Sequence, residues 1–124
     1  MKDEKEVAWV GDAKEVICAF PTPMRKDVGY QIRRVQAGLE PDDWKSVERI
    51  GPGAKEIRCQ DKAGWYRVFY VAKFEEAVYV LHAIRKKTNE TPIAEIDKAK
   101  GRYSAVLAHR KELKESTKVK GRAK

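Results

Sequence analysis

The first candidate for chemistry is an arginine inside an apolar run. Arg67 interrupts WYRVFYV, which has the length and composition of a buried β-strand. A guanidinium there must either pair with a carboxylate or open into a cleft where a phosphate can replace that carboxylate. Glu56 and Glu75 are the candidate partners, and the sequence leaves both alternatives open. Arg58 poses the same question in the preceding run, although its neighbours at a spacing of two, Glu56 and Gln60, favour a solvated face.

A basic segment follows the third of three apolar runs. Arg85, Lys86 and Lys87 lie between the end of that run and the expected start of the last helix. Free backbone N–H groups and the positive end of the helix dipole favour an anion at such a position. A solvated run of charges is the alternative, but the coincidence of basic side chains with a helix start favours binding.

His82 is a further candidate, near the end of the same apolar run. Its ordinary pKa suits proton transfer. A lone histidine on an apolar strand is more often a packed core residue, and we expect His82 to share a face with Val78 and Val80. The sequence therefore leaves open whether His82 is a catalytic residue or a core residue.

Five aromatic side chains are interleaved with these charges, and bases of single-stranded RNA stack on such rings. Strands normally use aromatic residues for packing, so most of the five are expected in the core. Tyr66 and Tyr70, on the face opposite Arg67, are the candidates for contact with RNA. The five are Trp65, Tyr66, Phe69, Tyr70 and Tyr79.

The charge of the chain favours a polyanionic partner. Its 124 residues carry a net charge of +8, and 37% of them are charged. Residues 1–53 hold 9 Lys and Arg against 10 acids, whereas residues 54–124 hold 18 against 9, a net of +9. A field spread over the second half favours nucleic acid. A protein with only a basic tail is the alternative.

Several kinds of site are not expected. Cys18 and Cys59 form no C-x-x-C pair, and the sequence has no Gly-rich phosphate loop, G-x-S-x-G motif or carboxylate cluster suited to Mg²⁺. We therefore predict no metal or cofactor. A nuclease without metal can use the RNA 2′-hydroxyl as its nucleophile, which makes RNA the substrate. With no membrane-length apolar run and no signal peptide, we predict a cytoplasmic protein.

The pattern of apolar residues predicts one α+β domain over residues 1–115, with a basic disordered tail at 116–124. Connections between the last three strands are short, which favours an antiparallel sheet flanked by helices. The expected order is β-α-α-β-β-β-α. The elements are a strand at 7–10, helices at 12–20 and 22–39, a crossing loop at 40–53, strands at 54–60, 65–72 and 77–84, and a helix from Thr91-Pro92.

Four motifs occur in order between Trp44 and Arg102: EIR, GWYRVFY, VYVLHAIRKKT and TPIAEIDKAKGR. Together they resemble the phage-derived, HigB-type branch of the RelE/ParE toxin superfamily. The resemblance implies a RelE-like fold and the toxin of a type II toxin–antitoxin system. It also implies an antitoxin partner, often a helix-turn-helix protein.

RelE-like members cleave mRNA in the ribosomal A site without metal, so the resemblance implies mRNA and the ribosome as partners and translation as the target. By position, Arg67 matches the arginine that contacts the scissile phosphate, and Arg58 matches the arginine that ends the E-I-R motif. His82 matches the histidine of the LHA motif, whose role the resemblance leaves open. The candidate catalytic residues are Arg67, Arg58 and His82; the candidate RNA-binding residues are Lys86, Lys87, Arg85, Tyr66 and Tyr70.

The sequence also departs from the pattern of its relatives. Tyr103 lies in the apolar stripe of the last helix rather than at a catalytic position, and His109 lacks the acidic and aromatic neighbours of a HigB site. The general base is therefore undetermined. A ParE-like toxin that inhibits gyrase, or a phage-derived nucleic-acid-binding protein without catalysis, is the alternative function.

Overall fold

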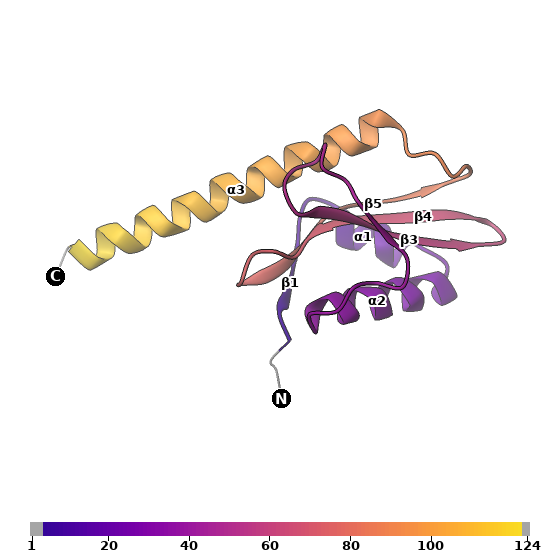
Figure 1. The fold of residues 1–124 in the computed structure, drawn as a ribbon, viewed down its shortest axis with the longest axis horizontal. Coiled ribbons are helices and arrows are strands. Elements are labelled where there is room, and N and C mark those ends of the chain that lie inside the picture. The colour runs from indigo at the N-terminus through magenta and orange to yellow at the C-terminus, as the bar shows by residue number, and fades with distance from the viewer. Residues whose placement is uncertain (1–3, 123–124) are drawn as a thin grey trace.

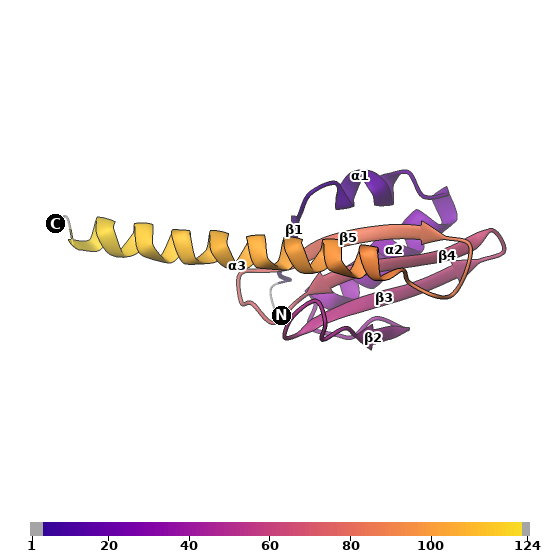
Figure 2. The same cartoon turned by 90° about the horizontal axis from the view of Figure 1, so that it is seen from above.

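The computed structural model describes the backbone of residues 4–122 and the side chains of residues 4–116. Its elements, in chain order, are β1 (Glu6–Trp9), α1 (Ala13–Cys18), α2 (Thr22–Gln36), β2 (Trp44–Ser46), β3 (Ala54–Asp61), β4 (Gly64–Val71), β5 (Ala77–Lys86) and α3 (Ile93–Arg122). The strands form one sheet in the order β1-β5-β4-β3-β2 (Figures 1 and 2). β1 pairs with β5 in parallel, and all other neighbours pair antiparallel. The predicted α+β class with a mainly antiparallel sheet is confirmed.

Helices cover both faces of the sheet. Figures 1 and 2 show α1 and α2 against one face and α3 along the other. On the first side, Ile17 and Val28 of the helices pack in one core with Val68 of β4. On the second side, Tyr103 of α3 packs in another core with Val71 of β4. The apolar residues on both faces of β4 and β5 are buried for this reason, as the sequence predicts.

The structure contains one strand that the sequence does not predict. β2 lies inside the segment 40–53, which the sequence predicts to be a crossing loop, and pairs with β3 at the sheet edge. All three residues of β2 are exposed. No apolar alternation therefore distinguishes this segment from a loop. The observed order is β-α-α-β-β-β-β-α rather than β-α-α-β-β-β-α.

Two helix ends also differ from the prediction. α2 ends at Gln36, and Leu39 is 51% exposed instead of continuing the core stripe. The chain leaves this helix through Gly38, whose φ of 85° is a left-handed conformation that glycine adopts without strain. α3 extends to Arg122 and so includes residues 116–122, where the sequence predicts disorder. This segment continues the preceding turns of α3, and extending an existing helix costs less than starting one. Residues 123–124, which complete that predicted tail, lie outside the described residues.

A β-bulge in β5 decides where His82 points. The pairing of β4 with β5 shifts at this place, so that Leu81 is an extra residue in β5. Leu81 belongs to the core on the α3 side and His82 contacts α3, whereas Val78 and Val80 belong to the opposite core. The prediction that His82 shares a face with Val78 and Val80 is wrong, because the extra residue breaks the alternation.

His82 is 3% exposed and belongs to a polar network between the sheet and α3. Its Nδ1 accepts a hydrogen bond from Arg102 Nη1 at 3.2 Å, and its Nε2–H donates to the Glu95 carboxylate at 3.3 Å. Arg102 also donates to the Leu81 carbonyl and to the Asp12 carboxylate. Burial lowers the pKa of His82, and the donor at Nδ1 leaves no place for a second ring proton. The neutral imidazole is thus a structural part of the fold.

This buried histidine makes stability depend on pH. The unfolded chain takes up a proton at about pH 6.5, whereas the folded protein takes it up only at lower pH. The free energy of unfolding therefore falls as the pH drops below about 6.5, by about 1.4 kcal/mol for each unit by which folding lowers this pKa. Urea unfolding at about pH 7.5 and about pH 5.5 measures this loss. We expect His82→Asn to reduce the difference between the two pH values, and His109→Ala, at an exposed position of α3, to leave it unchanged.

Two glycines provide a matched pair of stability tests. A Cβ atom at Gly11 would lie 2.6 Å from Cζ of Arg102, and Gly11 has a φ of 56°. We expect Gly11→Ala to destabilise the fold by at least about 1–2 kcal/mol, the cost of left-handed backbone alone. A Cβ atom at Gly29, inside α2, would meet nothing within 4 Å. Gly29→Ala should stabilise by about 0.5–1 kcal/mol in the same unfolding experiment. A Gly11→Ala variant as stable as the parent would contradict the left-handed backbone at Gly11.

Candidate functional site

Alternate residues of three strands form a polar surface on the sheet face that α3 covers. Arg58 of β3 lies opposite Arg67 of β4. The next row on the same face consists of Gln60, Trp65 and Lys86. α3 packs on the apolar residues further along these strands. The pairing of β3, β4 and β5 therefore brings together basic residues that are up to 28 positions apart in the sequence.

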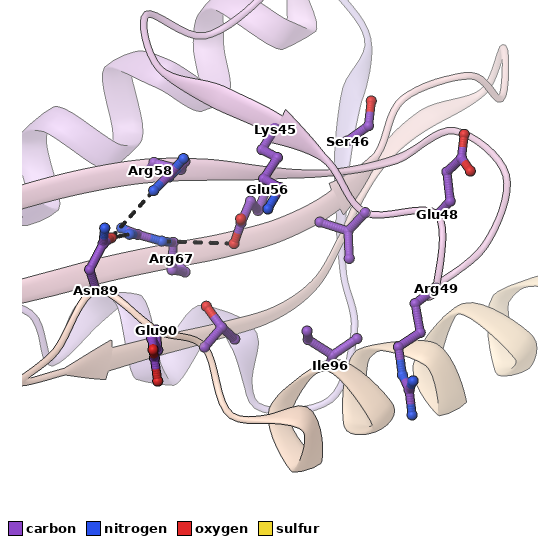
Figure 3. Close-up of a pocket in the computed structure, with 12 residues that line it drawn as sticks. Lys45, Ser46, Glu48, Arg49, Glu56, Arg58, Arg67, Asn89, Glu90 and Ile96 are labelled. Carbon is purple, nitrogen blue, oxygen red and sulfur yellow. Dashed lines mark hydrogen bonds and ion pairs between the residues drawn. The ribbon is translucent and has the colours of Figure 1, made fainter.

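A cleft of about 570 Å³ opens at this surface. It lies between β2 and the turn after it, the central strands β3 and β4, the loop before α3, and the first turn of that helix (Figure 3). The residues that line it are Lys45, Ser46, Val47, Glu48, Arg49, Glu56, Arg58, Arg67, Asn89, Glu90, Thr91 and Ile96.

Arg67 is held at the floor of this cleft and is 2% exposed. Its Nη2 donates to Asn89 Oδ1 at 2.6 Å, its Nη1 donates to the Tyr66 carbonyl at 3.0 Å, and its Nε lies 3.8 Å from Glu56 Oε2. Burial is the main cause that lowers the pKa of Arg67. The sequence leaves two alternatives for Arg67, a carboxylate partner or an open cleft. The structure contains both: Arg67 lies near Glu56, not Glu75, and it also lines the cleft.

Arg58 stands beside Arg67 and points toward the same acceptor (Figure 3). Its Nη2 donates to Asn89 Oδ1 at 3.3 Å. Its Nε is buried and has no hydrogen-bond partner within the part of the chain that the structure describes. The charge of Arg58 also contributes to lowering the pKa of Arg67. The two guanidinium groups thus share one neutral amide oxygen, and among the described residues Glu56 is the carboxylate within 4 Å, paired with Arg67. This arrangement favours binding of an anion.

Lys86 adds a third cation in the next row of the same face. Its Nζ donates to the Asn89 carbonyl at 2.9 Å and to the hydroxyl of Thr91. Burial and the charge of Arg67 lower the pKa of Lys86 to about 8. The amine and ammonium forms are therefore both populated near neutral pH. Lys87 follows at an exposed position at the start of the loop.

Of the predicted site residues, Arg58 and Arg67 alone line the cleft. Lys86 contacts Asn89 and Thr91 at its edge without lining it. Arg85 lies on the opposite face of β5 from Lys86, with its guanidinium 5.5 Å from the ring centroid of Tyr66. Tyr66 and Tyr70 are 0% and 1% exposed in the core under α1 and α2. Neither ring is accessible to a bound RNA, because each serves as packing for these helices. His82 does not line the cleft, and its ring nitrogens already have partners.

Two residues of the site were not expected from the sequence. Asn89 joins both arginines, and Trp65 is the half-buried aromatic residue beside Arg67. The position of Trp65 on the same face as Arg67 follows from strand alternation, so this residue could have been preferred over Tyr66 and Tyr70. Nothing in the sequence around Asn89 indicates its role, because the course of the loop decides it.

The described residues contain neither a metal-binding cluster nor a membrane-spanning helix. Among the described residues, no three His, Cys, Asp or Glu side chains are arranged so that they could hold a metal ion. No helix in the described part of the chain has the length and apolar composition needed to cross a membrane.

Comparison with known proteins gives one result that bears on this site. The profile of the family described as "Phage derived protein Gp49-like (DUF891)" matches residues 15–104, which include both arginines, Lys86 and Asn89. No curated protein matches the chain. No solved structure matches it either. Since the match covers well over half of the sequence, the chain belongs to the phage-derived Gp49-like family.

Proposed function

We propose that the protein is the toxin of a type II toxin–antitoxin pair and that it cleaves mRNA at the ribosome. Its family is compatible with a toxin-like protein of phage origin. The resemblance to RelE-like toxins suggests the reaction, which needs no metal ion. In this proposal a cognate antitoxin, of the helix-turn-helix class, neutralises the toxin in the cytoplasm.

The observation that supports this function most strongly is the pair Arg58 and Arg67. The two guanidinium groups are fixed by strand pairing, one of them is buried, and both point at one position, the Oδ1 atom of Asn89. A phosphoryl oxygen carries more negative charge than an amide oxygen and is the stronger acceptor. In the proposed complex, a phosphate oxygen takes the place of Asn89 Oδ1 between the two arginines.

The reaction that suits this arrangement is internal transfer of the phosphate. The RNA 2′-oxygen attacks the adjacent phosphorus, the bond from phosphorus to the 5′-oxygen breaks, and the product ends in a 2′,3′-cyclic phosphate. The 2′-hydroxyl gives its proton to a base, and the departing 5′-oxygen takes a proton from water. Negative charge grows on the phosphoryl oxygens in the transition state. Donors that are already oriented there stabilise it most.

Lys86 is the base in this proposal. Its lowered pKa of about 8 gives a substantial amine fraction near neutral pH, and such a fraction is what general-base catalysis requires. Its Nζ is held at the loop that also carries Asn89. Both ring nitrogens of His82 are hydrogen-bonded, to Glu95 and Arg102, so we do not propose this histidine as the base.

Substitution of Arg58 tests the arginine pair with the least disturbance of the fold. Arg67→Ala would leave the buried Glu56 carboxylate unpaired, whereas Arg58 is partly exposed and has no carboxylate partner in the described structure. We expect Arg58→Ala to lower the rate of mRNA cleavage by roughly 10²–10³-fold, the effect of losing one oriented donor. The assay is cleavage in a translation extract, followed by primer extension.

Arg85→Ala is the matched control, since this residue carries the same charge next to Lys86 but on the other face of β5. An equal fall in the cleavage rate of Arg58→Ala and Arg85→Ala would show that the rate depends on overall charge and not on the arginine pair. RNA binding without cleavage would favour the non-enzymatic alternative. DNA damage with intact mRNA would favour a ParE-like action on gyrase.

The proposal that Lys86 is the general base predicts how the cleavage rate depends on pH. If Lys86 accepts the proton, its amine is the active form, and the cleavage rate rises with pH and levels off above about 8. Arginine keeps the positive charge but does not lose its proton in this range. We therefore expect Lys86→Arg to cleave slowly and without this pH dependence. A variant that keeps the parent's profile would exclude Lys86 as the base.

A further inference from the structure

A second hollow lies beside the arginine pair. It has a volume of about 240 Å³ and shares Arg58, Arg67 and Asn89 with the larger cleft. Its other walls are Asp43, Cys59, Gln60 and Trp65. The two guanidinium groups therefore stand at the border of two adjoining spaces. A ligand whose phosphate lies between the arginines can extend into either of them.

Trp65 gives this hollow an aromatic wall. The indole is half-buried on β4, in the row between Gln60 and Lys86. The Arg67 guanidinium lies 5.8 Å from its ring centroid, so the aromatic surface and the anion-binding group are neighbours. Planar bases of any sequence stack on such surfaces.

The size of the hollow limits what it can hold. Its volume is below the roughly 300–1,000 Å³ of pockets for drug-sized ligands. One flat aromatic ring system of about the size of an indole is the group that matches this space and the wall beside it. Asp43 and Gln60 add polar groups suited to hydrogen bonds with a base edge.

We propose that the hollow beside Trp65 is a nucleobase subsite, which takes the base attached to the phosphate held by Arg58 and Arg67. The ligand class is a nucleoside phosphate, and RNA is its source if the proposed function holds. This inference rests on that function for the identity of the substrate, but binding of a nucleotide can be measured without any cleavage.

The test compares three probes on the full chain by calorimetric titration: adenosine 3′-monophosphate, inorganic phosphate and adenosine. Adenosine 3′-monophosphate should bind more tightly than adenosine or inorganic phosphate. Its base can fill the hollow beside Trp65 while its phosphate lies between the two arginines. Trp65→Leu should weaken nucleotide binding by roughly 5- to 150-fold, the range that stacking on one aromatic ring supplies. It should leave the affinity for inorganic phosphate unchanged. Trp65→Phe, which keeps an aromatic ring, should retain most of the nucleotide affinity.

Trp44→Leu is the matched control, because Trp44 is a partly exposed tryptophan on β2 that does not line the hollow. We expect Trp44→Leu to change neither the affinity for adenosine 3′-monophosphate nor the affinity for inorganic phosphate. Equal affinity of the parent for nucleotide and phosphate would overturn the subsite, as would a Trp65→Leu variant that binds the nucleotide like the parent. Nucleotide binding that depends on Trp65, in a protein that cleaves no RNA, would support the subsite and reject only the proposed reaction.

Discussion

The pairing of β3 with β4 imposes the constraint on which the site depends, because it sets two guanidinium groups side by side on one face. Arg58 and Arg67 repel each other, and one of them is buried. Glu56 and the amide oxygen of Asn89 balance them only in part. The Nε of Arg58 has no partner among the described residues. An arrangement of this kind costs stability in the free protein. The phosphate in our proposal would offset this cost.

The second polar centre, around His82, shows the opposite arrangement. Each ring nitrogen of His82 has a partner, and Arg102 links the histidine to the sheet backbone and to Asp12. The bulge at Leu81 turns His82 toward α3 and into this network. A complete network stabilises the junction between α3 and the sheet, whereas the incomplete one at the arginines remains available for binding. This difference in hydrogen bonding is the reason that we propose a structural role for His82 and a binding role for the arginine pair.

Much of the fold could be predicted from the sequence, because alternating and helical apolar patterns report burial directly. β4 and β5 were predicted as central strands for this reason, and Arg67 was recognised as a charge out of place. β2 could not be predicted, since its three residues are exposed and show no apolar alternation. The prediction that His82 shares a face with Val78 and Val80 is wrong because a one-residue bulge does not change the composition of an apolar run. Tyr66 and Tyr70 were mistaken for ligand contacts because an aromatic residue in a strand looks the same whether a helix or solvent covers it.

The chemical form of the cleaved RNA end tests the account most directly. Attack by the 2′-hydroxyl leaves a 2′,3′-cyclic phosphate, or the 3′-phosphate formed by its hydrolysis, on the upstream fragment and a 5′-hydroxyl on the downstream fragment. Mass spectrometry of a short mRNA cleaved on ribosomes distinguishes these ends. We expect the cyclic phosphate or the 3′-phosphate, together with a 5′-hydroxyl on the downstream fragment. A 3′-hydroxyl with a 5′-phosphate would mean that water or another external nucleophile attacks, and would contradict the role assigned to Lys86 and to the arginine pair.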